Sequence, residues 1–339
     1  MNILFRCDGS VNIGMGHIVR SLALADKLNE EYECKIFFAI RSSILAINKV
    51  KEKYYVFESD EVNFNYKEWL YECIKKMNIS IFIMDMRDGL SRSDLKELKL
   101  EANIKVVTID DPEDKRLEAD LAFYPPVPQL KKICWTDYDG ELYIGWEYVI
   151  LRQEFLISPE VKSNTLPEIL ILMGGTDENN MTEFIINALN QVTQSFKAII
   201  VVGSGYLFLE KLKKKISGMS FQYELYINPP EISNIMSKVD FGIISFGQTA
   251  YELAALKVPG FYVCLTNDHM ESSKLFSNNK IGFSIGEFFD INELEVVINI
   301  DSYLNGELDL YNKSTWPDEI KISDLNKISQ IIMREKANV

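Results

Sequence analysis

The glycine-rich turn at residues 8–17 is the first stretch of the chain that could carry chemistry. It reads DGSVNIGMGH and joins an apolar run to a helix-period run. Gly14 and Gly16 permit a tight turn and let a ligand approach the backbone closely. His17 falls in the first turn of the predicted helix, whose partial positive charge disfavours an imidazolium. We therefore predict a neutral His17 that acts as a general base, with Asp8 orienting the ring or binding substrate hydroxyls, although a histidine that merely caps the helix is the alternative.

Two more glycine turns follow apolar runs in the second half of the chain. One is MGGTD at 173–177, and the other is SFGQTA at 245–250. A turn that opens a helix presents backbone N–H groups to a phosphate, and an ordinary capped turn is the alternative for each. The predicted diphosphate contacts are Gly174, Gly175, Thr176, Gly247, Gln248, Thr249 and Ala250. Glu252 lies about one turn into the second helix, where a carboxylate can accept both hydroxyls of a ribose.

Polar side chains at the ends of other apolar runs, or in the first helix turns, are candidates for substrate contacts. They are Arg20, Asp85, Arg87, Asn267 and Asp268, with Asp88, Asp110 and Asp111 as further carboxylates. For His269, next to Asp268, an exposed histidine in a capped helix is an equally good interpretation. Paired carboxylates can hold a divalent metal. Because no further ligands accompany them, we predict no metal and no organic cofactor.

The elements that must position these residues alternate between apolar runs rich in β-branched residues and helix-period stretches, which predicts parallel sheets. In the first half the predicted strands are Asn2–Phe5, Lys35–Ala39, Tyr54–Phe57, Ile79–Asp85 and Lys105–Ile109. In the second half they are Ile169–Met173, Ala198–Val202, Phe221–Leu225, Phe241–Ile244 and Gly260–Cys264. The predicted fold class is α/β, with two doubly wound, Rossmann-like domains facing a central cleft, because ligands bind beyond the carboxyl ends of such strands.

The segment 158–167, SPEVKSNTLP, is polar and bounded by prolines, and it predicts the interdomain linker. We therefore expect an N-terminal domain with the histidine at 1–157 and a C-terminal nucleotide-binding domain at 158–339. The last helical stretch, Ile322–Lys336, could pack on either domain.

The composition narrows the classes of partner. The formal net charge is −14 and no cationic stripe is visible, so we exclude nucleic-acid binding. No apolar run is long enough to span a bilayer, which argues against stable membrane insertion. The five cysteines have neither metal-ligand nor disulfide spacing. They favour reduced thiols and a cytoplasmic location.

Taken in order, the motifs resemble one family. The stretch RCDGSVNIGMGHIVRSLALADKL is similar to the opening of the UDP-sugar hydrolase of pseudaminic acid biosynthesis, whose relatives include the spore-coat polysaccharide proteins. The wider fold of that family is the GT-B fold of glycosyltransferases. Further similarities follow in VVTIDDPEDKRLEADL, YIGWEYVILRQEF, ILILMGGTDENN and FGIISFGQTAYELAALKVPGFYV. They span most of residues 2–270, which makes the series far more specific than any single motif.

The resemblance implies inverting hydrolysis without a metal or organic cofactor. Water activated by His17 would attack the anomeric carbon of a UDP-sugar, and UDP would leave. Asp8 and the 14–16 turn would line the sugar site, whereas the glycine turns of the C-terminal domain would hold the diphosphate and Glu252 the ribose.

Two stretches depart from the hydrolase pattern. Met86 and Arg87 follow Asp85 where the hydrolases usually have a tyrosine, which looks more like the spore-coat branch, and Phe123–Pro126 replaces an Asp-Gln-Asn pattern. Both stretches lie on the predicted sugar side. They bear on the identity of the sugar and on the choice of water as acceptor.

Our leading interpretation is a hydrolase that cleaves the glycosyl–phosphate C–O bond of a UDP-activated, N-acetylated deoxy sugar in nonulosonic acid or surface-polysaccharide biosynthesis. The first alternative is a glycosyltransferase of the same fold with a sugar or lipid acceptor. The second is a non-catalytic nucleotide-sugar binding protein, in which His17 would be buried or turned away. A nicotinamide-dependent dehydrogenase is disfavoured, because the first turn lacks a full Gly-x-Gly-x-x-Gly. The predicted partner is the nucleotide sugar, and nothing in the sequence predicts a protein partner.

Overall fold

The computed structural model describes residues 1–9, 15–41, 44–59, 65–156 and 165–334, which form two compact units. The N-terminal unit comprises Met1–Pro126, Leu130–Arg152 and the segment that starts at Ile322. The C-terminal unit comprises Val127–Gln129 and Gln153–Lys321. The chain thus divides between Arg152 and Gln153, whereas the boundary predicted after residue 157 lies outside the described residues, as does most of the predicted linker.

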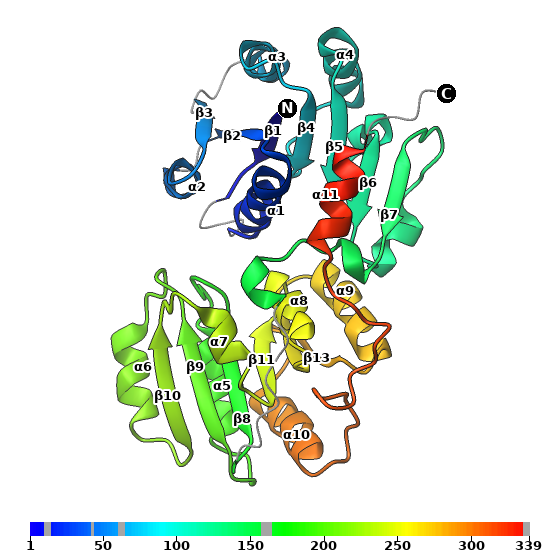
Figure 1. Ribbon diagram of the computed structural model, residues 1–339. Helices are drawn as coiled ribbons and strands as arrows, with labels where there is room; N and C mark the ends of the chain where they lie inside the picture. The colour runs from blue at the N-terminus through cyan, green and yellow to red at the C-terminus, as the bar shows by residue number, and fades with distance from the viewer. Residues whose placement is uncertain (10–14, 42–43, 60–64, 157–164, 335–339) are drawn as a thin grey trace. The chain divides into compact units, whose positions relative to one another are not determined.

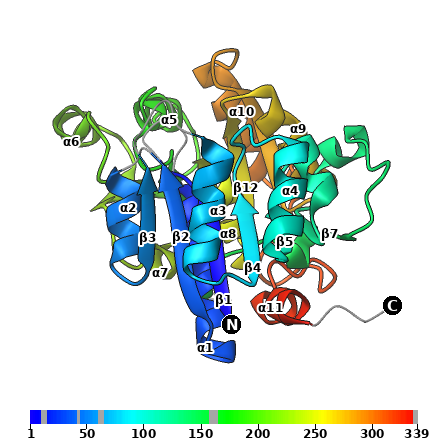
Figure 2. The same ribbon diagram turned by 90° about the horizontal axis from the view of Figure 1, so that it is seen from above.

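The N-terminal unit is built on a parallel sheet of seven strands in the order β3-β2-β1-β4-β5-β6-β7. Figure 2 shows β3, β2, β1 and β4 side by side. The strands are β1 (Asn2–Cys7), β2 (Lys35–Arg41), β3 (Tyr55–Ser59), β4 (Ile81–Asp85), β5 (Lys105–Ile109), β6 (Leu121–Tyr124) and β7 (Glu141–Ile144). Five of them were predicted, whereas β6 and β7 were not. Apolar side chains of β1 pack on both faces, because helices cover the sheet on both sides.

Helices cover both faces of this sheet (Figure 1). They are α1 (Gly16–Tyr32), α2 (Ile44–Lys51), α3 (Tyr66–Lys76), α4 (Arg92–Ala102) and α11 (Leu325–Met333). Apolar residues of α1, α2 and α11 share one core, and those of α3 and α4 form the core on the other face. The last helix therefore belongs to the N-terminal unit, where Ser329 Oγ donates a hydrogen bond of 2.8 Å to Glu31 of α1.

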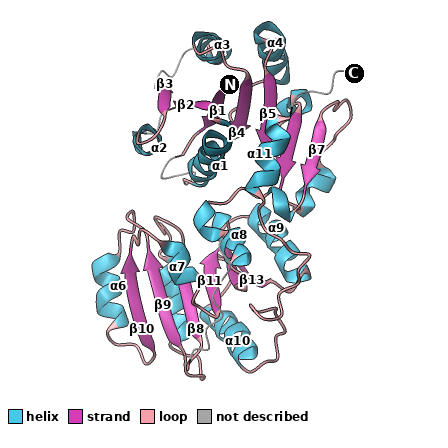
Figure 3. Cartoon of the chain, in the orientation of Figure 1, coloured by secondary structure: helices cyan, strands magenta, loops and turns pink. Residues whose placement is uncertain are grey.

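The C-terminal unit repeats the plan with six parallel strands in the order β10-β9-β8-β11-β12-β13 (Figure 3). The strands are β8 (Glu168–Leu172), β9 (Lys197–Val202), β10 (Gln222–Ile227), β11 (Phe241–Ser245), β12 (Gly260–Cys264) and β13 (Gly282–Glu287). The helices are α5 (Met181–Leu189), α6 (Leu209–Ile216), α7 (Ile232–Met236), α8 (Gln248–Ala255), α9 (Asn267–Asn278) and α10 (Glu293–Leu304). Across both units, the described residues also form four short 3-10 helices: η1 (Asp114–Glu118), η2 (Pro128–Lys132), η3 (Trp146–Tyr148) and η4 (Gln153–Phe155).

Each sheet has one topological switch point, where the strand order reverses. It lies between β1 and β4 in the N-terminal unit and between β8 and β11 in the C-terminal unit. Ligands of doubly wound folds bind outside the carboxyl ends of the strands at such points. The prediction of two doubly wound α/β sheets is confirmed, and the turns that follow these four strands are the places to search for a site. None of the helices in the described ranges is both long and apolar enough to cross a membrane.

Candidate active site

His17 and Asp85 meet at the switch point of the N-terminal sheet. His17 is the second residue of α1, which follows β1, and Asp85 is the last residue of β4, paired in register with Cys7 of β1. The distance from His17 Nδ1 to Asp85 Oδ1 is 2.8 Å, and the side chain of His17 is 33% exposed whereas that of Asp85 is fully buried. The fold thus joins a solvent-accessible imidazole to a buried carboxylate.

This contact fixes which nitrogen of the imidazole carries the proton. An ionised carboxylate can only accept hydrogen bonds, so Nδ1 must donate to Asp85 at the 2.8 Å separation. The lone pair of Nε2 is then the basic position of the ring. An imidazole held in this way by a buried carboxylate is the arrangement that a general base requires.

Asp85 stays ionised in spite of its burial. Burial alone would raise its pKa, but the charge of Arg20, together with the hydrogen bonds from Arg20 and His17, lowers the pKa well below its usual value. Arg20 Nε donates at 2.7 Å to Asp85 Oδ2, and Ser21 Oγ donates to the same oxygen at 3.2 Å. The carboxylate is therefore both charged and fixed in place.

Asp110 extends this cluster to the end of β5. It has a left-handed backbone conformation with φ of 53°, which is strained for a residue other than glycine, and its side chain is 33% exposed. Its Oδ2 lies 3.5 Å from Arg20 Nη1. Sequence reasoning named Asp85 and Asp110 as strand-end candidates but did not find their link to His17 and Arg20, because nothing in the spacing reveals it.

Asp8 has other partners. It accepts hydrogen bonds from Arg6 Nη2 at 2.8 Å and from the backbone N–H of Arg41 at 2.7 Å, which tie the end of β1 to β2. In the described structure it is Asp85, not Asp8, that orients His17. Of the two predicted glycines of this turn, Gly16 opens α1, and Gly14 lies outside the described residues.

Buried ion pairs anchor the loop that follows Asp85. The carboxylate of Asp88, whose side chain is 1% exposed, lies 2.9 Å from the Nζ of Lys115, and the Tyr66 hydroxyl donates to the same carboxylate. Lys115 also pairs with a second buried carboxylate, that of Asp111. Burial raises the pKa of Asp111 to about 6. The loop is thereby fixed, and it presents Arg87 as an exposed side chain.

In the C-terminal unit, the predicted glycine turns meet at the other switch point. Gly174 follows β8 with φ of 87°, and a Cβ placed on it would lie 3.7 Å from the Oγ of Ser245, which ends β11. A Cβ placed on Gly175 or Gly247 would meet no atom within 4 Å. The two turns are therefore neighbours, and their glycines leave space beside the backbone.

A third turn, after β9, was missed by the sequence analysis. A Cβ on Gly203 would approach the carbonyl oxygen of Gly175 to 2.3 Å, so only glycine allows this close contact. Gly205 is similarly close to Thr176, with 2.8 Å between its added Cβ and Thr176 Cγ2. The signal was available in the sequence as the Gly-Ser-Gly that follows the strand.

The two helices beside these turns differ as anion sites. Asp177 accepts from the backbone N–H groups of Met181 at 2.7 Å and Thr182 at 2.9 Å, so its carboxylate already satisfies the start of α5. The start of α8 has Gly247 as its N-cap residue and therefore no capping side chain. The start of α8, with Gln248, Thr249 and Ala250, is thus the better place for a phosphate, and Glu252, buried at 6% exposure, lies one turn further on.

The remaining predicted contacts lie at the start of α9. Asn267 and Asp268 are exposed, and Thr266 Oγ1 caps the helix by accepting from the N–H of His269 at 3.2 Å. Burial lowers the pKa of His269, although Asp268 opposes this, and its ring packs beside Phe246.

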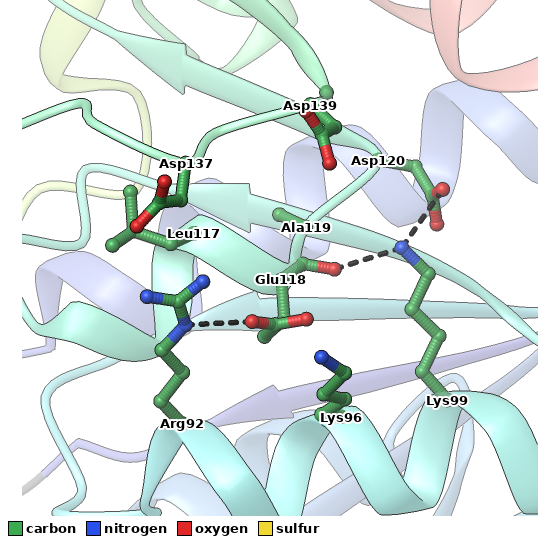
Figure 4. Close-up of a pocket in the computed structure, with 10 residues that line it drawn as sticks. Arg92, Lys96, Lys99, Leu117, Glu118, Ala119, Asp120, Asp137 and Asp139 are labelled. Carbon is green, nitrogen blue, oxygen red and sulfur yellow. Dashed lines mark hydrogen bonds and ion pairs between the residues drawn. The ribbon is translucent and has the colours of Figure 1, made fainter.

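A polar pocket of about 480 Å³ lies elsewhere in the N-terminal unit, along α4 (Figure 4). Arg92 and Lys99 line it and pair with Glu118 at 2.6 Å and Asp120 at 3.0 Å. None of the predicted site residues lines this pocket. Within the described ranges, no three His, Cys, Asp or Glu side chains are arranged to hold a metal ion.

Comparison with solved structures defines the class of fold. The crystal structure of Acinetobacter baumannii MurG superposes with a TM-score of 0.75 at 12% sequence identity, over 98% of this chain and 99% of that chain. A glycosyltransferase from Rickettsia africae gives a TM-score of 0.64 at 15% identity, over 99% of each chain. The fold is thus of the GT-B type, as predicted.

Comparison with curated proteins confirms the predicted resemblance. Over 270 residues the chain is 27% identical to the UDP-2,4-diacetamido-2,4,6-trideoxy-beta-L-altropyranose hydrolase of Campylobacter jejuni, covering 78% of this chain and 92% of that protein. It is 22% identical over 291 residues to the spore coat polysaccharide biosynthesis protein SpsG of Bacillus subtilis, covering 84% of each. An uncharacterized protein of Methanocaldococcus jannaschii is 27% identical over 76% of this chain, which spans only 54% of that protein. No protein-family model matches the chain.

Proposed function

We propose that the chain hydrolyses the glycosyl–phosphate C–O bond of a UDP-activated, N-acetylated deoxy sugar and releases UDP, in nonulosonic acid or surface-polysaccharide biosynthesis. The observation that carries the proposal is the 2.8 Å hydrogen bond between His17 Nδ1 and the buried Asp85, which leaves Nε2 as a base. The similarity to the Campylobacter hydrolase supports the choice of reaction and of sugar class. The thiols, four of the five buried and all of them free, favour a reducing, cytoplasmic location.

The proposed reaction uses this pair of residues. Nε2 of His17 takes a proton from water, and the water oxygen forms a bond to the anomeric carbon on the face opposite the leaving group. The bond between that carbon and the phosphate oxygen breaks with its electron pair, so UDP leaves and the configuration inverts. Asp85 stabilises the imidazolium that forms, as the carboxylate of a catalytic triad does.

The C-terminal unit would hold the leaving group without a metal ion. The start of α8 and the turn at Gly174 and Gly175 offer backbone N–H groups to the diphosphate, whose charge increases as the bond breaks. Glu252 would accept the ribose hydroxyls. On the sugar side, Asp8, Arg87, Asn267 and Asp268 are the proposed contacts.

A glycosyltransferase is the second candidate, because the solved structures of the same fold include a glycosyltransferase. The same base would then take its proton from an acceptor hydroxyl. A purely binding role is disfavoured, because the side chain of His17 is 33% exposed and its Nδ1 is engaged so that Nε2 is the basic atom.

The test is release of UDP from a panel of UDP-linked 2,4-diacetamido-2,4,6-trideoxy sugars with no acceptor added. The wild type should release UDP, and His17→Ala should lose at least about a hundredfold in rate. Binding of UDP without its release from any donor sugar would reject the hydrolase and favour the transferase. Release of UDP that begins only when an acceptor is added would establish the transferase.

A further inference from the structure

We propose that Arg20 is a positioning residue that sets the tautomer of His17 by holding Asp85 ionised and in place, and does not contact the substrate. The sequence analysis predicted Arg20 as a substrate contact on the sugar side. The inference deepens the proposed function and rests on it only where catalysis is measured, because the tautomer of His17 can be observed without turnover.

The guanidinium of Arg20 is already occupied within the protein. Its Nε and Nη2 donate to the two oxygens of Asp85, the former at 2.7 Å, and its Nη1 lies 3.5 Å from Asp110 Oδ2. The side chain is 14% exposed. A bidentate pair between a planar guanidinium and a carboxylate is among the strongest hydrogen-bonded pairs in proteins. Contact with a sugar would require Arg20 to leave a buried, ionised carboxylate.

Arg20 and His17 share one acceptor atom. Asp85 Oδ1 accepts from both His17 Nδ1 and Arg20 Nη2, and these two nitrogens lie 3.1 Å apart. If Nδ1 were instead the acceptor of a bond from Arg20, its lone pair would face the Asp85 oxygen at 2.8 Å without a proton between them. That repulsion excludes the second tautomer, so the separation of 3.1 Å is a contact between two donors.

Arg20 also keeps the carboxylate ionised. Its charge and its hydrogen bonds lower the pKa of Asp85 in spite of burial, so Asp85 can only accept from Nδ1. The other groups that face this cluster are Asp110 at the end of β5 and Cys7 at the end of β1. Burial, and then the Asp85 carboxylate, raise the pKa of Cys7, so it contributes a neutral thiol.

Removal of the guanidinium should therefore act on His17 and not on substrate affinity. In Arg20→Gln we expect kcat to fall by about tenfold or more with KM changed by less than about twofold. In Arg20→Lys the charge remains but the bidentate contact is lost, so kcat should fall with KM again little changed.

Nitrogen-15 NMR of the histidine rings provides the readout that does not need turnover. The chain has two histidines, so His269→Gln leaves His17 as the single signal. We expect the Nδ1–H tautomer in this background, and a loss of that preference in Arg20→Gln. Arg92→Gln, which removes an arginine of α4 that pairs with Glu118, is the matched control and should leave the tautomer unchanged.

An unchanged tautomer in Arg20→Gln would overturn the proposal, and so would a raised KM at unchanged kcat. If Arg20→Gln does not fold, Arg20→Lys tests the proposal in its place. The measurements are then the tautomer of His17 and whether kcat or KM changes. Should the wild type release no UDP, the proposed function fails while the NMR result still decides the role of Arg20.

Discussion

His17 receives its orientation from a residue 68 positions further along the chain. The helix start places the ring, and the end of β4 supplies the carboxylate, so neither element alone makes a base. Residue types and the glycine turn were enough to predict His17. Asp8, the nearest carboxylate in sequence, was predicted to orient the ring or to bind substrate hydroxyls. The spacing of residues in the sequence cannot reveal that β1 and β4 are neighbours in the sheet.

Replacement of Asp85 tests this dyad. Asp85→Asn keeps the shape but lets the amide favour the wrong tautomer, so kcat for UDP release should fall by about 10²–10⁴-fold. Asp8→Asn, whose carboxylate contacts Arg6 and the backbone of Arg41, should cost clearly less in kcat. Steady-state rates for both variants provide the measurement, and equal losses would contradict the assignment.

Asp111 predicts a pH dependence of stability. Burial raises its pKa to about 6, so the folded state keeps a proton that the unfolded chain, with the ordinary value of 3.8, has already lost. The free energy of unfolding contributed by this group therefore decreases as the pH rises from about 4 to about 6. Asp111→Asn lacks this titration, so the stability of the wild type relative to the variant should decrease over that window. Urea unfolding at several pH values measures the difference, and a constant difference would contradict the prediction.

At the scale of elements, ten of the thirteen described strands were predicted. The glycine turns, and the strands that precede them, follow from buried β-branched runs and from the residues that permit tight turns. The strands β6 and β7 were missed, because each has only four residues, and β13 was missed because its glycines interrupt the apolar run. None of the three carries a predicted site residue.

The glycine turns allow a test that separates binding from folding. Alanine at Gly175 or Gly247 would meet no atom within 4 Å, so the melting temperature should change little. If the diphosphate uses this space, the added methyl group should weaken UDP binding by about tenfold, a loss of about 1.4 kcal/mol. Gly218→Ala, at the end of α6, is the matched control. Calorimetric titration with UDP provides the affinities, and unchanged affinity in both variants would place the diphosphate elsewhere.

At the scale of the whole molecule, two units of similar plan carry different parts of the proposed chemistry. The N-terminal unit has the proposed base, His17, at its switch point, and the C-terminal unit has the glycine turns at its own. With a net charge of −14, the overall field does not attract a diphosphate, so local dipoles must hold it. Alternation of strands and helices was enough to predict this architecture. The order of strands within each sheet was not predictable, because it depends on contacts between segments far apart in sequence.

Isotope labelling tests the central claim most directly. We would let the wild type turn over a UDP-linked 2,4-diacetamido-2,4,6-trideoxy sugar in ¹⁸O-enriched water and analyse both products by mass spectrometry. Attack of His17-activated water on the anomeric carbon predicts one ¹⁸O in the released sugar and none in UDP. Label in the phosphate of UDP would show that the P–O bond is the one that breaks, which would contradict the account.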